Sequence, residues 1–196
     1  MQAKLFAEQV GPSDESVTEI NQELFATLGP RFPQRSFVFG MGNENARVVV
    51  IGESPGPQDL ATGEPFTGPA GDLLKRILAS IGLRHADCFL TNVVKFISQG
   101  DELTLEIVAL FTPYVRREVA AIAPKIVILI GATPTKALLD TKKPISQVRG
   151  EFHVVNGITY LPTFNPAYLL RDPSKKKEVW DDMKKAREFL SNSQST

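Results

Sequence analysis

The chain has 196 residues, and its 22 lysines and arginines balance 22 aspartates and glutamates, so its formal net charge is zero. A chain of this length suits one domain with a substantial core, and a neutral balance leaves only a local basic surface to support nucleic-acid binding. The absence of a long apolar run and of a cleavable leader predicts a soluble, cytoplasmic protein. The one cysteine, Cys88, lies among apolar neighbours, which indicates a core residue and excludes an intrachain disulfide and a multi-cysteine metal site.

Apolar periodicity alternates between helical and strand patterns along the chain, and no internal repeat interrupts it. In chain order it first predicts a helix at 16–28, a strand at 47–52, a helix around 73–81 and a strand at 88–94. Two helical pieces follow, of which the later begins near Pro113, and then a strand at 125–130 and a short helix that ends at Leu139. The last predicted elements are a hairpin at Asn156-Gly157, a strand that ends at Thr163 and a final helix after Asp172-Pro173. We expect one domain over 1–196, with its core at about 39–190 and a frayed tail at 191–196.

Strands that are apolar throughout and separated by helices are typical of a mostly parallel sheet with helices on both faces. We therefore predict an α/β fold in three layers, α/β/α, around a central four-stranded, mostly parallel sheet. Ligands of such sheets bind beyond the carboxyl ends of the strands. The segments at those ends are Gly52 to Gly56, Asn92, Gly131 to Thr133, and Phe164 to Pro166.

Glu53 follows the first buried strand directly, in the turn GESPG. The turn alone is equally typical of a tight bend with a solvated glutamate. Its position at the strand end, however, should partly desolvate the carboxylate and fix it against the sheet, which suits a general base or an electrostatic stabiliser.

Two other residues allow both a structural and a functional interpretation. Phe66, in GEPFTGPAG, either fills the core beneath its loop or offers a flat surface on which a planar ring can stack. Asn92, inside an apolar strand, needs partners for both ends of its amide, which a neighbouring loop or a ligand could supply. An amide matches the adjacent N–H and C=O groups of uracil and equally those of hypoxanthine.

The stretch FNPAYLLRDPSKKK at 164–177 joins a proline-braced turn to two leucines, an arginine and a lysine run. Lysine runs are usually solvated helix faces, and Asp181 and Asp182 partly neutralise this one. A basic cluster beside an apolar wedge is also what a protein needs to hold phosphates and displace a base from its stack.

Six motifs in this order, GESPGPQD, GEPFTGPAGDLL, LTNVVK, PKIVILIGATPTKALL, VRG and NPAYLLRDPS, resemble the iron–sulfur branch of the uracil-DNA glycosylases over roughly Phe39 to Leu190. The resemblance implies a four-stranded parallel sheet, a monomer, and DNA as the partner. It also implies that the protein flips a deaminated base out of the helix and removes it by cutting its N-glycosidic bond.

The resemblance also assigns roles to residues of this chain. Glu53 would orient or activate the water, Phe66 would stack on the flipped base, and Asn92 would bind the edge of that base. Asn165 would contact the departing base, together with backbone N–H groups near Gly52. Beyond these assignments, we predict that the side that contacts phosphates and the minor groove of DNA comprises Ser54, Pro55, Gly56, Leu170, Arg171 and Lys175.

Two features depart from the family pattern. The four cluster cysteines of the iron–sulfur branch would fall at Ala26, Gly29, Phe96 and Phe111, so we predict no cluster, no other cofactor or metal, and apolar packing in its place. Asn165 stands where that branch has histidine. An amide can donate to the departing base but cannot become a cation, and a weakened donor of this kind costs about 10²–10³ in rate.

Three hypotheses follow from these patterns. The first is a DNA glycosylase acting on uracil, hypoxanthine or xanthine in base excision repair. The second is a non-catalytic relative that recognises damaged DNA, which the missing cluster and histidine favour and the retained Glu53, Phe66 and Asn92 oppose. The third, a small-molecule enzyme with GESPG as its phosphate turn, lacks both the GxGxxG spacing and a P-loop lysine.

Overall fold

The computed structural model describes residues 14–96 and 103–193. They form a six-stranded sheet in the order β1-β3-β2-β4-β6-β5. The strands are β1 (Met41–Gly42), β2 (Val48–Gly52), β3 (Phe89–Asn92), β4 (Ile126–Ile130), β5 (His153–Val155) and β6 (Ile158–Thr163). The central strands β3, β2, β4 and β6 are parallel, whereas β1 and β5 pair antiparallel at the edges. The predicted four-stranded parallel sheet is therefore present, with one short antiparallel strand added at each edge.

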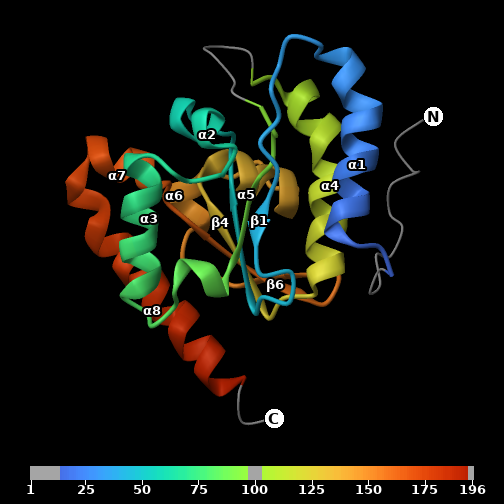
Figure 1. The fold of residues 1–196 in the computed structure, drawn as a ribbon. Helices are drawn as coiled ribbons and strands as arrows, with labels where there is room; N and C mark the ends of the chain where they lie inside the picture. The colour runs from blue at the N-terminus through green and yellow to red at the C-terminus, as the bar shows by residue number, and fades with distance from the viewer. Residues whose placement is uncertain (1–13, 97–102, 194–196) are drawn as a thin grey trace.

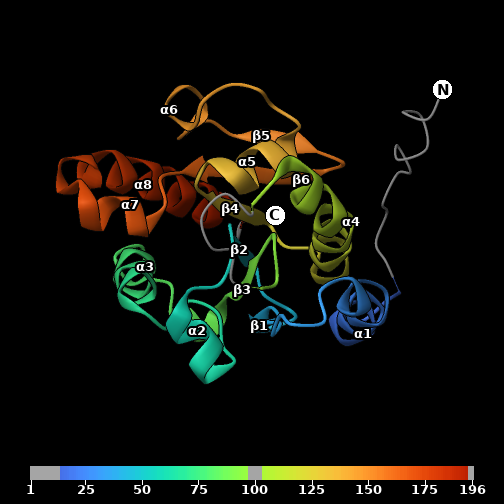
Figure 2. The ribbon, with the colours of Figure 1, turned by 90° about the horizontal axis from the view of Figure 1, so that it is seen from above.

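Helices cover both faces of the sheet, which confirms the three-layer α/β/α architecture (Figures 1 and 2). The helices are α1 (Val17–Leu28), α2 (Pro57–Thr62), α3 (Pro69–Ala79), α4 (Leu105–Ile122), α5 (Ala132–Leu139), α6 (Ile145–Val148), α7 (Pro166–Arg171) and α8 (Lys176–Asn192). One face packs against α1, α4 and α5, and the other against α3, α7 and α8. Within the described part of the chain, no helix is both long and apolar enough to cross a membrane.

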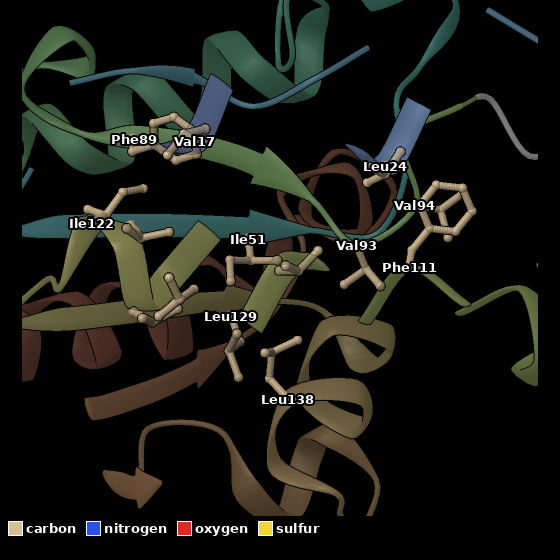
Figure 3. Packing of buried hydrophobic residues seen from close by; sticks show 14 of the residues in the cluster. Val17, Leu24, Ile51, Phe89, Val93, Val94, Phe111, Ile122, Leu129 and Leu138 are labelled. Atoms are coloured by element: carbon tan, nitrogen blue, oxygen red, sulfur yellow. The ribbon is translucent and has the colours of Figure 1, made fainter. Parts of the chain in front are cut away.

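The strands are apolar at every position because both of their faces are covered. In β2, Val49 and Ile51 face the layer of α1 and α4, whereas Val48 and Val50 face the layer of α3 and α8. Figure 3 shows the first of these cores, in which Ile51 packs among side chains from β4, α4 and α5. Two buried faces explain why the sequence shows continuous apolar runs rather than alternation.

Local sequence signals set several element ends as predicted. The Ser16 hydroxyl accepts a hydrogen bond from the Glu19 N–H at 3.2 Å, and a Glu19 oxygen accepts one from the Ser16 N–H at 2.8 Å, so a capping box starts α1. Asn156 and Gly157, with φ angles of 51° and 78°, form the predicted hairpin turn between β5 and β6.

Two predicted boundaries are wrong. The break before Pro113 is absent, because α4 is one helix that contains this proline. Proline costs a helix interior one hydrogen bond and about 3 kcal/mol, but Phe111 and Val115 on either side of it are both fully buried, and their packing keeps the helix continuous. The predicted frayed tail also begins too early, since α8 runs to Asn192, and 194–196 lie outside the described residues.

Candidate active site

Glu53 is held at the carboxyl end of β2 from both neighbouring strands. On the β3 side, the N–H groups of Val93 and Val94 donate to the carbonyls of Gly52 and Glu53 at 2.9 and 3.0 Å. On the β4 side, the Thr133 hydroxyl donates to Oε2 of the Glu53 carboxylate. The carboxylate is partly buried, as its place after a buried strand predicts. Both its backbone and its side chain are thus fixed by the sheet and the turn after β4.

Asn92, Gly52 and Phe66 form a tight group beside Glu53. Gly52 pairs with Asn92 in the β2–β3 register, so the two strands end together. A Cβ on Gly52 would lie 2.4 Å from Asn92 Oδ1 and 2.8 Å from Phe66 Cζ, so no larger residue fits there. The Asn92 side chain is buried, and neither Oδ1 nor Nδ2 has a hydrogen-bond partner in the described structure. The bonds to a neighbouring loop that would make Asn92 a purely structural residue are therefore missing.

Phe66 has an unusual backbone that its surroundings maintain. Its φ angle is 61°, a left-handed conformation that bulky residues seldom adopt. Gly71, in the first turn of α3, allows the Phe66 backbone to approach, because a Cβ there would lie 1.8 Å from the Phe66 carbonyl oxygen. Strained residues of this kind persist where neighbouring contacts over-determine them, often at binding sites.

Asp59 joins the two loops that frame the group. Its buried carboxylate accepts hydrogen bonds from the Gly56 N–H at 2.9 Å, the Thr67 N–H at 2.8 Å and the Thr67 hydroxyl at 2.9 Å. Gly56 belongs to the turn after Glu53, and Thr67 follows Phe66. The carboxylate of Asp59 therefore fixes the position of Phe66 relative to the end of β2.

Asn165 faces this group from the end of β6, and its amide is already oriented. Oδ1 accepts the Ala167 N–H at 2.8 Å and caps α7, which leaves Nδ2 as the free end. A Cβ on Gly131 would lie 3.4 Å from Asn165 Cβ and 3.6 Å from Nδ2. The turn after β4 therefore packs directly against Asn165.

An ion pair between Arg149 and Asp182 contacts the segment that precedes Asn165. Arg149 pairs with Asp182 of α8, and the Asp182 carboxylate also accepts the Thr163 hydroxyl at 2.6 Å. The Arg149 guanidinium lies 5.5 Å from the ring centre of Phe164. Burial raises the pKa of the Asp182 carboxyl, although the Thr163 hydroxyl and Arg149 oppose that shift. These contacts fix the segment that carries Asn165 to α8.

A cavity of ≈ 250 Å³ lies among these side chains. This volume suits a single nucleobase better than a drug-sized ligand, whose pockets start at about 300 Å³. Residues that line it are Glu53, Ser54, Gly56, Pro57, Gln58, Asp59, Phe66, Gly68, Pro69, Ala70, Gly71, Asn92, Asn165, Pro166 and Ala167. Glu53, Phe66, Asn92 and Asn165, which the sequence predicted to share one site, all line this cavity.

The residues predicted to contact DNA occupy different positions. Ser54 and Gly56 line the cavity, whereas Pro55 beside them is buried. Leu170 and Arg171 are exposed on α7, and Leu170 keeps 47% of its surface accessible although it is apolar. Lys175 pairs with Glu178 at 2.8 Å, which raises the pKa of its ammonium and partly neutralises its charge. Leu170 and Arg171 are thus more accessible than Lys175 for the predicted contact with DNA.

The positions at which the iron–sulfur branch carries cysteines do not fit a cluster. Ala26 is exposed, and a Cβ on Gly29 would meet the Phe25 ring at 3.4 Å. Phe96 and Phe111 are buried, with ring centres 5.6 Å apart, and Phe32 and Phe37 pack on both of them. Among the described residues, no group of three or more His, Cys, Asp or Glu side chains could hold a metal ion.

Sequence reasoning missed two residues that shape the site and gave a third no role. Thr133 belongs to the segment that the sequence placed at the end of β4, but a threonine in a turn carries no signal of its own, so no function was assigned to it. Asp59 stands three residues after Gly56, the spacing of a residue that caps a helix start. Gly71 has no signal in a single sequence, because its close approach to Phe66 depends on the tertiary fold.

Comparison with known proteins agrees with this geometry. The family model of the uracil DNA glycosylase superfamily matches residues 39–184. The type-4 uracil-DNA glycosylase of Thermotoga maritima is 36% identical over 158 residues, 78% of this chain and 82% of that protein. The enzyme of the same name from Saccharolobus solfataricus is 36% identical over 170 residues, 81% of this chain and 78% of that protein. The one from Archaeoglobus fulgidus is 34% identical over 170 residues, 82% of this chain and 85% of that protein. The chain therefore belongs to the uracil-DNA glycosylase superfamily, on its type-4 branch, and hence to the monofunctional DNA glycosylases that hydrolyse N-glycosyl bonds.

Proposed function

We propose that this protein removes uracil from DNA, by holding the flipped nucleotide in the cavity and hydrolysing its N-glycosidic bond. The observation that carries the proposal is the buried amide of Asn92, whose two polar atoms have no partner in the described structure. A buried polar atom without a partner costs about 1–3 kcal/mol, which a ligand with a complementary edge would recover. Uracil presents adjacent C=O and N–H groups that match the amide.

The side chains around the cavity supply the steps of a dissociative reaction. As the C1′–N1 bond breaks, its electron pair leaves with the base and the sugar becomes an oxocarbenium-like cation. Asn165 Nδ2, oriented by the cap on α7, donates to the departing anionic base. The Glu53 carboxylate stabilises the cation and aligns a water, whose oxygen bonds to C1′ while its proton passes to Glu53 or solvent. Because Asn165 cannot become a cation, we expect turnover slower by about 10²–10³ than with histidine.

The choice of base follows from the amide and from the relatives together. Hypoxanthine shares the edge that Asn92 would bind, and xanthine is similar there, so the amide alone does not separate these bases from uracil. The type-4 relatives are named uracil-DNA glycosylases, which favours uracil as the substrate of this chain.

We also propose that the protein works as a monomer and without an iron–sulfur cluster. The phenylalanine rings at two of the four positions that carry cysteine in the iron–sulfur branch support the absence of a cluster, because they leave apolar packing where thiolates would be required. The purified protein should therefore show no iron–sulfur absorbance and no iron by elemental analysis. Stoichiometric iron in freshly purified protein would contradict the proposal.

The test is a glycosylase assay on labelled oligonucleotides that carry uracil, hypoxanthine, xanthine or thymine, in single strands and in each mismatch. We expect alkali-cleavable product from uracil, strongly reduced in Glu53→Gln while DNA binding persists. Glu44→Gln is the matched control, because Glu44 is exposed and does not line the cavity. An unchanged rate in Glu53→Gln would remove this carboxylate from the mechanism.

The same assay separates the enzyme from a non-catalytic relative. If no base is released while the protein binds the same damaged strands tightly, the fold has been retained for recognition. The absent cluster cysteines and the absent histidine are the features that favour this second function.

A further inference from the structure

Thr133 makes one hydrogen bond that links the turn after β4 to the carboxylate of Glu53. It is the second residue of α5 and is itself partly buried. It does not line the cavity, so it reaches the site only through Glu53.

The turn that carries Thr133 is fixed independently of Glu53. The Gly131 N–H donates to the Thr163 carbonyl at 2.9 Å, which continues the pairing of β4 with β6. The Thr135 hydroxyl donates to the Gly131 carbonyl at 2.7 Å and is buried. Thr133 is therefore held at a set distance from the end of β2, as a support for a catalytic side chain must be.

The hydrogen bond distinguishes the two oxygens of the Glu53 carboxylate. Oε2 accepts the Thr133 hydroxyl, whereas Oε1 accepts no hydrogen bond from any described residue. Without Thr133, the carboxylate could rotate about its terminal torsion, which is broad for glutamate. With it, one oxygen is held and the other stays available to a water in the cavity.

We propose that Thr133 is a positioning residue for base release, which fixes the Glu53 carboxylate so that Oε1 holds the attacking water. This inference rests on the proposed function, because it assigns Thr133 a role only through Glu53. A loosely held catalytic group can cost about 10²-fold in rate when it shifts by 1 Å.

The test compares Thr133→Val with Thr133→Ser in single-turnover release of uracil. We expect Thr133→Val to lower the rate by about 10- to 100-fold, with little change in the dissociation constant for uracil-containing DNA. Thr133→Ser keeps the hydroxyl and should keep most of the rate. Thr112→Val is the matched control, because the Thr112 hydroxyl donates to Val108 within α4, away from the cavity.

A double variant shows whether Thr133 acts through Glu53. In the Glu53→Gln background, Thr133→Val should lower the residual rate no further, because the carboxylate that it positions is already gone. If it lowers the rate as much as in the wild-type background, or if Thr133→Val alone is as active as wild type, the inference is wrong although the protein remains a glycosylase. A wild-type protein that releases no uracil would refute the proposed function and this inference together.

Discussion

Replacing Asn92 by leucine should make the protein more stable and less active at once. In the free protein the amide is 2% exposed, and both of its polar atoms lack partners in the described structure. Each such atom costs about 1–3 kcal/mol, and leucine has a similar shape without them. We take the cost of one atom as the net gain, about 1–3 kcal/mol, because the leucine must also fit beside Gly52 and Phe66. For a chain of this size, that corresponds to a rise of roughly 2–12 °C in Tm.

Activity should move in the opposite direction. A bidentate amide contact to a base edge contributes about 1–3 kcal/mol, so Asn92→Leu should lower kcat/KM on uracil by about ten- to a hundredfold. Urea unfolding and single-turnover base release measure the two effects on one preparation. Asn92→Asp is the control, because it buries a carboxylate and should destabilise the fold. Loss of stability in Asn92→Leu would mean that the amide has partners in the free protein and was not left open for a ligand.

Three further predictions concern the core. Phe111→Ala should lower the free energy of unfolding by about 3–5 kcal/mol, because the ring is fully buried among other phenylalanines. Urea denaturation measures this loss. A loss below about 1 kcal/mol would show that this packing does not replace the stabilising effect of a cluster. Lys95 and Glu118 form a fully buried ion pair at 2.8 Å. Lys95→Met leaves the Glu118 carboxylate buried without its partner, so it should lower the free energy of unfolding by about 3–5 kcal/mol in the same measurement, and the double variant Lys95→Met with Glu118→Leu should lower it much less. Equal losses in the two variants would argue against an unpaired charge as the cause. Burial raises the pKa of the Cys88 thiol from 9.0 to about 12, so above pH 9 the unfolded chain loses a proton that the folded chain keeps. Stability should then fall with rising pH by about 1.4 kcal/mol per unit, and a Cys88→Ala variant with the same slope would refute this origin.

The place of the site was predictable because it depends on chain direction alone. Parallel strands bring their carboxyl ends to one edge, so the residues after each strand meet whatever the details of packing. Glu53, Asn92 and Asn165 each follow or end such a strand, and all three line the cavity. Phe66 was found in a different way, since a large ring in a loop of glycines and prolines stands out in the sequence.

The supporting contacts were not predictable, because they join residues far apart in the chain. Thr133 contacts Glu53 across 80 positions, and Arg149 contacts Asp182 across 33. Lys95 looks like a surface lysine in the sequence, yet its pair with Glu118 is fully buried. The edge strand β1 has only two residues, both exposed, so no apolar pattern indicates it. The predicted helix break at Pro113 was wrong for a related reason, because tertiary packing of the residues on both sides of the proline outweighs its low helix propensity.

The two departures from the iron–sulfur pattern lie in different parts of the molecule and have separate physical consequences. Phe96 and Phe111 belong to the core between α4 and the sheet, where ring packing can replace the stabilising effect of a cluster. Asn165 lies at the end of β6, where its Oδ1 is already used to cap α7 and its Nδ2 is the one donor left for a departing base. On the proposal that no cluster is present, the first change bears on stability and on the metal requirement. Under the proposed mechanism the second bears on the rate of base release, because the Oδ1 cap on α7 holds the segment that carries the donor.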